Sequence, residues 1–419
     1  MASTLQPVRG THDLLAQDFA RHQAVIAASQ ATALLYGFAR IDTPMFEFSE
    51  VFHRAVGETS DIVSKETYTF TDRGGESITL RPEFTAAIAR ALISNKLTQS
   101  LPFKCFYAGP AFRYERPQKG RLRQFHQIGA ELLGAAEPMA DVELIALGMH
   151  MLSTLGLDRS VRLEINSLGD SESRTHYREA LVQYLSQHEA KLSDDSKVRL
   201  HKNPLRILDS KDAGDREIVA GAPTLHDYFN DASAQHFARV KAGLDSLGIA
   251  YRVSEKLVRG LDYYSHTVFE ITTDQLGSQG TVLAGGRYDG LVKTMGGPEV
   301  SGIGFAAGVE RLVALQGDAQ DVQHGPLAAI IPMGEAAEDE AWKLAQQLRL
   351  QGLSIDIAYK GNAKKRFERA DKVKAKFAVI LGEDELKNGQ LTLKNLESGA
   401  QETLPRAAMM EKLKAYVVR

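Results

Sequence analysis

The hydrophobic and polar positions in the N-terminal third of the chain predict helices and strands in alternation. Residues 14–40 are rich in alanine and leucine and predict a helix, with Gly37 suited to the position after a helix C-terminus. Residues 79–94 predict the end of a strand followed by a second helix. Residues 103–115 and 124–133 predict two strands separated by the polar loop RPQKGRLR. Two strands joined in this way predict an antiparallel hairpin.

Changes in composition divide the rest of the chain. Residues 170–250 are charged and helix-biased, which indicates an insertion, whereas residues 256–308 are again rich in strand-forming residues and glycine. A polar segment at residues 316–325 is typical of a linker. After Pro326, apolar strand-like runs alternate with helical segments, which predicts a separate small α/β domain.

Composition and charge exclude several classes of protein. The 419 residues, 43% apolar and 25% charged, are typical of a globular chain of about two to three domains and exclude a disordered or fibrous one. With 50 Lys and Arg against 53 Asp and Glu, the chain is no polycation, so any nucleic-acid site must be a local patch. The single cysteine, Cys105, excludes an internal disulfide and a cysteine-cluster zinc site, and is more typical of a small core residue.

Targeting signals and common catalytic motifs are not found in the sequence. No apolar run of about 18 residues and no apolar signal stretch occurs, so we expect no membrane association and a cytoplasmic location. The P-loop, HExxH and GxSxG motifs are absent, and we expect no metal ion held by protein residues alone. The glycines from Gly302 to Gly308 have one residue too many for a dinucleotide-binding turn, so we interpret them as sites of close packing.

The loop of the predicted hairpin concentrates positive charge. A charged hairpin tip is usually a solvated loop. The alternation of side chains along the flanking strands favours another interpretation, because it places polar residues on one face and apolar residues on the other. Such a polar face is typical of a substrate floor or of a water-facing surface, and guanidinium groups suit phosphate oxygens. The cations are Arg113, Arg116, Lys119, Arg121 and Arg123, and the other polar-face residues are Glu115, Gln127 and Glu131, with Gly129 between the last two.

A second group of arginines and tyrosines follows. The string LVRGLDYY ends in two adjacent tyrosines, and AGGRYDGL predicts a turn that presents an arginine and a tyrosine. An arginine near the start of a helix is disfavoured by the helix dipole, so Arg311 is better explained by an anion that it binds, with an exposed side chain as the alternative. The residues of this group are Arg259, Tyr263, Tyr264, Arg287, Tyr288 and Arg311.

Six segments resemble one enzyme family. FYAGPAFRYERPQKGRLRQFHQIGAE resembles motif 2 of the class II aminoacyl-tRNA synthetases, GIGFAAGVERL resembles motif 3, and YGFARIDTPMFE resembles motif 1. LVRGLDYY and AGGRYDGL resemble the two peptides peculiar to histidyl-tRNA synthetases, and the resemblance as a whole is to the bacterial type of that family. The C-terminal string KKRFERADKVKAKFAVILGEDELKNG resembles the anticodon-binding domain of that family, so the resemblance covers essentially the whole chain.

The resemblance implies a fold and an assembly. The fold is an α+β catalytic domain with an antiparallel sheet of the class II synthetase type, plus a C-terminal α/β anticodon-binding domain. We expect the catalytic domain in residues 1–169 and 254–320, a helical insertion domain in residues 170–253, and the anticodon-binding domain in residues 326–419. Motif 1 implies a homodimer with a two-fold interface.

The resemblance also implies an activity, the ATP-dependent ligation of L-histidine to tRNA-His. Histidine would attack the α-phosphate of ATP and release pyrophosphate, and the ribose hydroxyl of tRNA-His would then take the histidyl group from AMP. ATP is a substrate in this scheme, with Mg²⁺ bridging its phosphates. Phosphoryl-transfer chemistry needs positioning and charge neutralisation more than a covalent nucleophile, and this chain offers arginines for that purpose.

The resemblance assigns roles at the nucleotide. Arg113 and Arg259 would bind the α-phosphate as the catalytic residues. Arg121 and Arg311 would bind the outer phosphates, and Glu115 would contact the adenine.

The same resemblance assigns the amino-acid and tRNA contacts. Histidine would be bound by Glu83, Thr85 and Gln127 at its α-amino group, by Glu131 and Tyr264 at its imidazole nitrogens, and by Tyr263 and Tyr288 as walls. The basic run 364–376 has seven cations and two acids, which is consistent either with a solvated helix face or, in this domain, with tRNA binding. The tRNA contacts are expected at Arg116, Gln118, Lys119, Arg123, Lys364, Lys365 and Arg366.

Two departures and two alternatives accompany the resemblance. Phe84 stands where many bacterial members have Gly, and Leu122 stands where Tyr is common. A non-catalytic paralogue, the regulatory subunit of ATP phosphoribosyltransferase, lacks the anticodon-binding domain that residues 326–419 resemble. A prolyl or threonyl synthetase shares that kind of domain but not the string LVRGLDYY.

Overall fold

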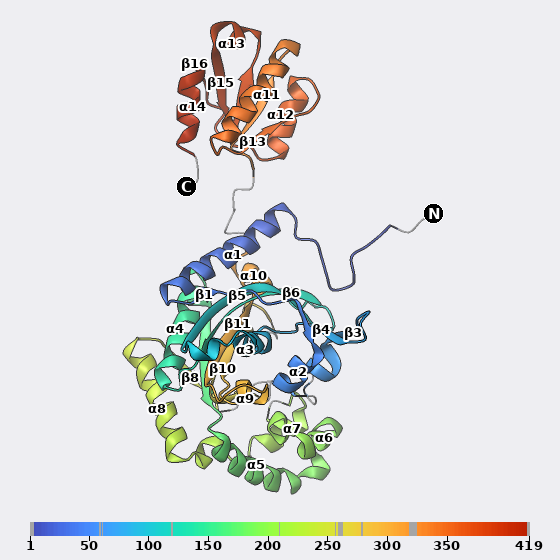
Figure 1. The fold of residues 1–419 in the computed structure, drawn as a ribbon, viewed down its shortest axis with the longest axis vertical. Helices are drawn as coiled ribbons and strands as arrows, with labels where there is room; N and C mark the ends of the chain where they lie inside the picture. Colours follow the sequence, from blue (N-terminus) through green and yellow to red (C-terminus); the bar gives the residue numbers. More distant parts are fainter. Residues whose placement is uncertain are drawn as a thin grey trace. The chain divides into compact units, whose positions relative to one another are not determined.

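The chain forms two compact units, residues 1–320 and residues 321–419 (Figure 1). The computed structural model describes residues 4–57, 60, 62–118, 120–208, 210–255, 257–258, 263–277, 280–317 and 325–416. Within these ranges, no helix is long and apolar enough to cross a membrane. Most of the expected linker at 316–325 lies outside the described residues.

An eight-stranded sheet forms the centre of the N-terminal unit, in the order β1-β5-β6-β11-β10-β9-β7-β8. All neighbours are antiparallel except the two end pairs, β1 with β5 and β7 with β8. This arrangement confirms the expected antiparallel sheet and the hairpin of β5 with β6. The strands are β1 (Ala39–Arg40), β5 (Phe103–Phe112), β6 (Gln124–Leu133), β7 (Arg162–Ser167), β8 (Arg252–Val253), β9 (Ser265–Thr272), β10 (Thr281–Arg287) and β11 (Gly302–Gly308).

Side chains on the two faces of this sheet pack into two separate hydrophobic cores. Ile128 and Leu132 of β6 point into a core with the helices on one face, whereas Cys105 and Tyr107 of β5 belong to a second core on the other. Cys105 is buried, in agreement with the expected core role. The helices on the first face are α1 (Ala16–Leu35), α4 (Pro138–Thr154), α8 (Asp231–Ser246) and α10 (Val309–Gln316).

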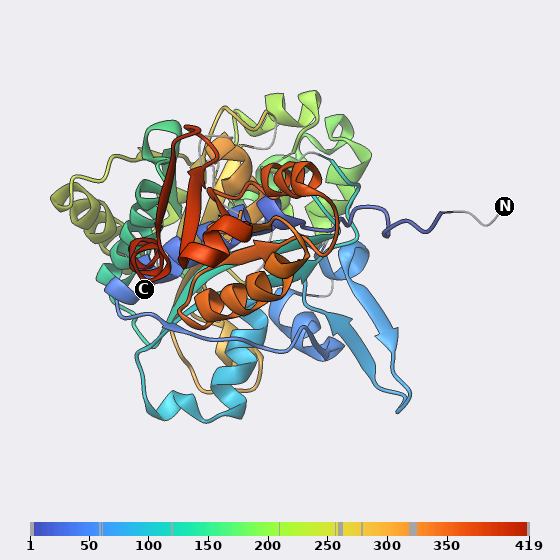
Figure 2. The same cartoon turned by 90° about the horizontal axis from the view of Figure 1, so that it is seen from above.

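The predicted N-terminal helix is shorter than expected at both ends. It spans Ala16–Leu35, and Gly37 has a φ of +79°, as the residue after a helix C-terminus often does. A smaller sheet, in the order β2-β4-β3, projects from the body of the unit as a hairpin (Figure 2). Its elements and neighbours are β2 (Phe46–Phe48), α2 (Ser49–Val56), β3 (Tyr68–Thr71), β4 (Ser77–Leu80), α3 (Thr85–Ser94) and the short α9 (Leu291–Thr294).

The charged segment at 170–250 is helical, as predicted, and each of the four α-helices in its described residues has a side-chain cap. Asp170, Ser193, Asp212 and Asn230 accept hydrogen bonds from backbone N–H groups at the helix starts. The segment leaves the sheet after β7 and returns at β8, which pairs with β7. Its last helix, α8, packs into the same core as α4. The other helices are α5 (Ser171–Ser186), α6 (Asp194–Lys202) and α7 (Ala213–Val219).

The C-terminal unit is an α/β fold, as the alternation after Pro326 predicts. Its five-stranded sheet has the order β13-β12-β14-β15-β16, with β12 parallel to both neighbours and β15 antiparallel to both of its own. The strands are β12 (Ala328–Pro332), β13 (Ile355–Ile357), β14 (Phe377–Leu381), β15 (Gln390–Asn395) and β16 (Gln401–Pro405). The helices are α11 (Glu335–Leu350), α12 (Ala363–Lys372), α13 (Glu383–Asn388) and α14 (Arg406–Lys414).

Candidate active site

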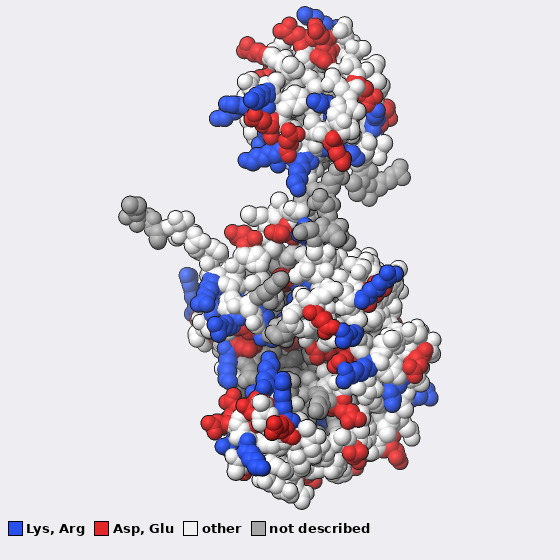
Figure 3. All heavy atoms as spheres, turned by 180° about the vertical axis from the view of Figure 1, so that it is seen from behind, with Lys and Arg blue, Asp and Glu red and all other residues white. Residues whose placement is uncertain are grey.

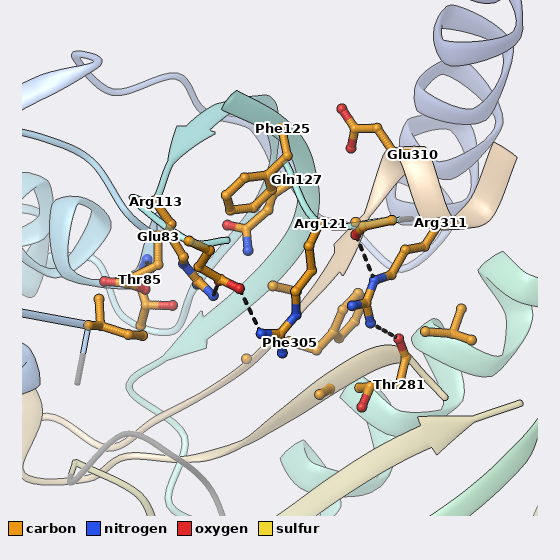
Figure 4. A pocket seen from close by; sticks show the side chains of 18 of the residues that line it. Glu83, Thr85, Arg113, Arg121, Phe125, Gln127, Thr281, Phe305, Glu310 and Arg311 are labelled. Atoms are coloured by element: carbon orange, nitrogen blue, oxygen red, sulfur yellow. Dashed lines mark hydrogen bonds and ion pairs between the residues drawn. The ribbon is translucent and has the colours of Figure 1, made fainter. Parts of the chain in front are cut away.

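A cavity of about 410 Å³ lies over the polar face of the large sheet (Figure 4). Its walls come from the β5–β6 hairpin, from β10 and β11, and from the starts of α3 and α10. The fold therefore brings together residues that are more than 200 positions apart in the sequence. The predicted site residues that line it are Glu83, Thr85, Arg113, Glu115, Arg121, Gln127, Tyr263, Tyr264, Tyr288 and Arg311.

The start of α3 places two polar side chains in the wall. The Glu83 carboxylate accepts hydrogen bonds from the backbone N–H groups of Thr85 at 2.7 Å and Ala86 at 2.8 Å. Burial raises the pKa of Glu83, and these hydrogen bonds and the charge of Arg113 oppose that shift. Glu83 thus bonds to the first N–H groups of α3 and at the same time lines the cavity.

Glu131 lies behind the wall and is held by two hydroxyl groups. The Thr85 hydroxyl donates to its Oε1 at 2.7 Å, and the Tyr288 hydroxyl donates to its Oε2 at 2.5 Å. Burial raises the pKa of Glu131 to about 8, although both hydrogen bonds act against that rise. Gly304 makes room for this carboxylate, because a Cβ atom there would lie 1.5 Å from the Glu131 Oε2.

Aromatic rings and one amide complete this buried part of the cavity. The rings of Tyr263 and Tyr288 meet edge to face with centroids 5.7 Å apart, and Tyr264 lies 4.7 Å from Tyr263. Gln127 is 8% exposed, and its amide oxygen has no hydrogen-bond partner in the described part of the chain. A buried oxygen without a hydrogen-bond partner is costly, so a ligand with an N–H donor that bonds to it would bind favourably.

Arginines form the other part of the cavity. Arg113 donates from its Nε to the carbonyl of Pro82 at 2.9 Å, and Arg121 donates to the Glu115 carboxylate at 2.7 Å. Arg311 reaches across to the carbonyls of Gly120 and Thr281 (Figure 4). Burial, together with the charge of Arg121, lowers the pKa of Arg311. Guanidinium groups held close enough to disturb one another are typical of an anion site.

The predicted tRNA-contacting residues of the hairpin lie at its tip. Arg116 and Gln118 are exposed, and the Arg123 guanidinium lies 3.9 Å from the centre of the Tyr114 ring. Lys119 and Arg259 lie outside the described residues.

The structure also shows the positions of Leu122 and Phe84, the two departures from the family pattern. Leu122 lines the cavity, whereas Phe84 is 1% exposed, stacks on Tyr107 and is not part of the lining.

One expectation about this region is wrong. The turn after β10 does not present Arg287 to a ligand, because the side chain is fully buried and forms an ion pair with Asp141. Its guanidinium also donates to the carbonyl of Ala135 at 2.9 Å. The local sequence pattern predicts the same exposure for Arg287 and Tyr288. It contains no information about Asp141, the buried carboxylate with which Arg287 pairs.

The sequence analysis missed several residues that line the cavity, among them Tyr107 and Glu310. Tyr107 lies on β5 six positions before Arg113, so the alternation of side chains already places both on one face. Glu310 stands at the start of α10 beside Arg311 and receives the backbone N–H of His126 at 2.9 Å. Nothing in the local sequence distinguishes Glu310 from an ordinary first-turn acid.

In the C-terminal unit, the basic run contributes two exposed lysines and one buried arginine. Lys364 and Lys365 are exposed at the start of α12. Arg366 is 5% exposed, donates to the carbonyl of Pro332 at 2.5 Å and pairs with Glu338, so the structure does not present it to solvent as expected. Figure 3 shows Lys and Arg side chains gathered on the lower part of this unit.

Two exposed aromatic residues lie in the same unit. Trp342 is 43% exposed and Tyr359 is 81% exposed, and their rings stack with centroids 5.9 Å apart. Tyr359 precedes the exposed Lys360 and stands five positions before Lys364. The sequence did not predict this pair, because Trp342 and Tyr359 are far apart in the chain. The packing of α11 against β13 brings them together.

Comparison with known proteins identifies the family. The histidyl-tRNA synthetase family profile matches residues 10–312, and the anticodon-binding domain profile matches residues 328–416. A histidine–tRNA ligase of Rhodospirillum rubrum is 54% identical over 415 residues, which cover 99% of this chain and 100% of that protein. One from Gluconobacter oxydans is 52% identical over 413 residues, 99% of each chain.

Solved structures agree with these matches. Apo histidyl-tRNA synthetase from S. aureus superposes with a TM-score of 0.83 at 36% identity, covering 98% of this chain and 100% of that chain. An ATP phosphoribosyltransferase regulatory subunit/histidyl-tRNA synthetase from Bacillus halodurans, at 22% identity and a TM-score of 0.66, shares the fold.

The sheet, the cavity and the matched domains define an aminoacyl-tRNA synthetase, an ATP-dependent ligase that charges tRNA. The chain belongs to the histidyl-tRNA synthetase family, and its reaction is the ATP-dependent ligation of L-histidine to tRNA-His. The two alternatives from the sequence are thereby set aside: the C-terminal domain is present, and the matching family is specific for histidine.

Proposed function

We propose that the 410 Å³ cavity is the place where L-histidine and ATP react, with histidine in its buried part and the phosphates among its arginines. The observation that carries this proposal is the unpartnered amide oxygen of Gln127 beside the Glu83 carboxylate. An α-ammonium group bound there would donate to both, and the hydroxyl oxygen of Thr85 could accept its third proton. This arrangement would orient the histidine carboxylate towards the arginines.

The imidazole of histidine would lie against Glu131 and Tyr264, with Tyr263 and Tyr288 as walls. Both Glu131 oxygens already accept a hydroxyl hydrogen bond, so the carboxyl group is fixed before the ligand arrives. Each oxygen keeps a further lone pair for an imidazole N–H. A site that binds a ring nitrogen through buried hydrogen bonds rejects analogues without that nitrogen, because the polar groups of the site would then have no partner.

Arginines would neutralise the charge that develops on the phosphates. Arg113, whose Nε is fixed by the Pro82 carbonyl, would bind the α-phosphate together with Arg259. Arg121 and Arg311 would bind the outer phosphates, and Glu115 would contact the adenine. The reaction then needs no protein nucleophile, because the histidine carboxylate attacks the phosphorus and pyrophosphate leaves.

Mg²⁺ would bridge the phosphates and add to this charge neutralisation. The carboxylates Glu115 and Glu310 in the cavity wall already have partners, so we expect them to contribute few ligands to the Mg²⁺ ion. Glu115 is paired with Arg121, and Glu310 accepts hydrogen bonds from His126. Phosphate oxygens and water would therefore supply most of the ligands, which is how Mg²⁺ is usually bound at nucleotides.

The test of the site is a pyrophosphate-release assay with histidine, and with proline and threonine as controls. We expect release that depends on histidine alone. A Gln127→Ala variant should raise the KM for histidine, because the ammonium loses an acceptor, while the KM for ATP changes little. A Gln127→Ala enzyme with unchanged KM for histidine would contradict the placement of the α-amino group.

For tRNA, we propose contacts on both units. The hairpin tip would meet the acceptor end through Arg116, Gln118, Lys119 and Arg123. In the C-terminal unit, Lys364 and Lys365 would bind phosphates, and the exposed Trp342–Tyr359 pair would stack on an unpaired base. Because Arg366 is buried in an ion pair, we assign it to holding α12 on the sheet instead of to tRNA.

Two variants separate these tRNA contacts. Replacing Lys364 and Lys365 with Ala should flatten the salt dependence of tRNA binding, because two phosphate contacts are lost. Tyr359→Ala should weaken binding by about 1–3 kcal/mol without changing the salt slope, since stacking is not electrostatic. Both should leave histidine-dependent pyrophosphate release unchanged, with Lys387→Ala as the control. A wild-type salt slope in the double variant would assign the two lysines to solvent.

We also propose a homodimer, formed through the small sheet. Its register places Phe46, Phe48 and Phe70 on one face, with Ile78 and Leu80 between them. The three phenylalanines are 57%, 57% and 49% exposed, an apolar surface that a second copy would cover. Light scattering should give the mass of two chains at micromolar protein, and Phe48→Asp should halve it. A wild-type mass of one chain would refute the dimer.

The remaining assignments complete the proposal. Residues 1–169 and 254–320 would be the catalytic domain, 170–253 the helical insertion domain, and 326–419 the anticodon-binding domain. A cytoplasmic location fits the substrates ATP and tRNA-His. Deleting residues 326–419 tests the division, because aminoacylation of tRNA should fall strongly while adenylate formation persists in the dimer.

A further inference from the structure

Two histidines and a glutamate from three separate elements meet beside the cavity. They are His22 of α1, His126 of β6 and Glu310 of α10, and one ligand atom of each lies within 4.8 Å of the others. The Glu310 side chain points away from that of Arg311 (Figure 4). The cluster therefore lies next to the nucleotide part of the cavity, on the side towards α1.

The cluster contains a polar atom that the protein itself does not satisfy. His22 is 5% exposed, and its Nδ1 has no hydrogen-bond partner within the described ranges of the chain. Its ring meets the ring of His126 edge to face, with centroids 5.6 Å apart. Leaving a buried ring nitrogen unpaired costs free energy, and a group bound by that nitrogen would recover it.

The other two residues lie within a few tenths of an ångström of the spacing of two ligands of one ion. The Nδ1 of His126 lies 2.9 Å from the Oε1 of Glu310. Ligand atoms about 2.0–2.1 Å from a tetrahedral zinc ion lie roughly 3.4 Å apart, so a small opening of this contact would admit the ion. The backbone N–H of His126 donates to both Glu310 oxygens, at 2.9 Å and 3.0 Å, and fixes the carboxylate from outside the cluster.

We propose that His22, His126 and Glu310 bind a divalent transition-metal ion of the zinc type. Two imidazoles and one carboxylate are ligands that Zn²⁺ accepts, whereas Mg²⁺ and Ca²⁺ prefer oxygen atoms alone. Three protein ligands leave a fourth position for water. The ion would join α1 to the large sheet and to the start of α10, and this site is separate from the Mg²⁺ that accompanies ATP.

Cobalt tests the proposal directly, because Co²⁺ replaces Zn²⁺ and absorbs visible light in a tetrahedral site. Untagged, chelator-treated full-length protein should bind one equivalent of Co²⁺ with strong visible absorption, and Zn²⁺ should displace it. His22→Phe should weaken binding by about 10–100-fold or more, since a ligand is lost. His176→Phe, an exposed histidine of α5, is the control and should bind as wild type does.

A second variant guards against misfolding of His22→Phe. Glu310→Gln keeps an acceptor for the His126 N–H but removes the anionic ligand, so it should also lose the cobalt spectrum. Zn²⁺ should raise the melting temperature of the wild type and not of either variant. Absence of a single saturable site in the wild type, or equal Co²⁺ binding in the wild type and both variants, would overturn the proposal and leave the cluster as a hydrogen-bonded contact.

Discussion

The two parts of the cavity differ in how their polar groups are held. In the buried part, Glu83, Glu131 and Thr85 bond to one another or to the start of α3, so their positions are set before a ligand binds. In the arginine part, the guanidinium groups are partly exposed and bond mainly to backbone carbonyls. A preorganised hydrogen-bonded network suits the recognition of a small amino acid, whereas guanidinium groups held by carbonyls suit the negative charge of phosphates.

The largest effect is expected in the arginine part. Arg113→Ala should lower the rate of adenylate formation by about 10²–10³, because a group that acts mainly in the transition state is lost. The affinity for histidine should change little. We expect Arg259→His to lower the rate of adenylate formation to a similar degree, because the string LVRGLDYY resembles the family peptide whose arginine binds the α-phosphate. Single-turnover rates and calorimetric histidine binding measure the two quantities, and an Arg113→Ala rate near the wild-type value would break the comparison.

The buried part should show the opposite pattern. Glu131→Ala should weaken histidine binding by about 1–3 kcal/mol, because an imidazole donor is left unpaired in a buried site. The affinity for ATP should stay close to that of the wild type. Calorimetry with each ligand checks this, with Glu143→Ala, a carboxylate of α4 outside the cavity, as the control. Equal loss of ATP and histidine affinity would show general damage instead of a specific contact.

Gly304 tests whether preorganisation depends on close packing. A Cβ atom at this position would displace the Glu131 carboxylate, so Gly304→Ala should weaken histidine binding by about 1–3 kcal/mol, the usual cost of overpacking. Gly308→Ala is the matched control on the same strand, because its Cβ atom would approach no closer than 3.8 Å to Arg311. Similar histidine affinities in the two variants would mean that the Glu131 position tolerates movement.

The smallest effect concerns pH and stability. Burial raises the pKa of Glu131 from 4.5 to about 8, so the folded chain keeps a proton that the unfolded chain releases. The contribution of this group to the free energy of unfolding therefore falls as the pH rises from about 4.5 to about 8. Urea unfolding of ligand-free protein should show this fall in the wild type and a flatter profile in Glu131→Gln. Parallel profiles would contradict the raised pKa.

Local sequence patterns were enough to place the main elements and one side of the site. The alternation along β5 and β6 separated Gln127 and Glu131 from Ile128, because side chains of a strand point to opposite faces whatever the rest of the fold does. The change of pattern after Pro326 predicted the second α/β unit for a similar reason. The roles of single residues came from strings that resemble a known family, and these remain predictions.

Tertiary structure alone decided which charged residues face a ligand. Arg287 and Arg366 are buried and pair with Asp141 and Glu338, partners 146 and 28 positions away, and no local pattern contains that information. The cluster of His22, His126 and Glu310 arises in the same way, from three distant elements that meet in space. A sequence fixes periodicity over neighbouring residues, whereas the burial and pairing of a charge depend on contacts between distant parts of the chain.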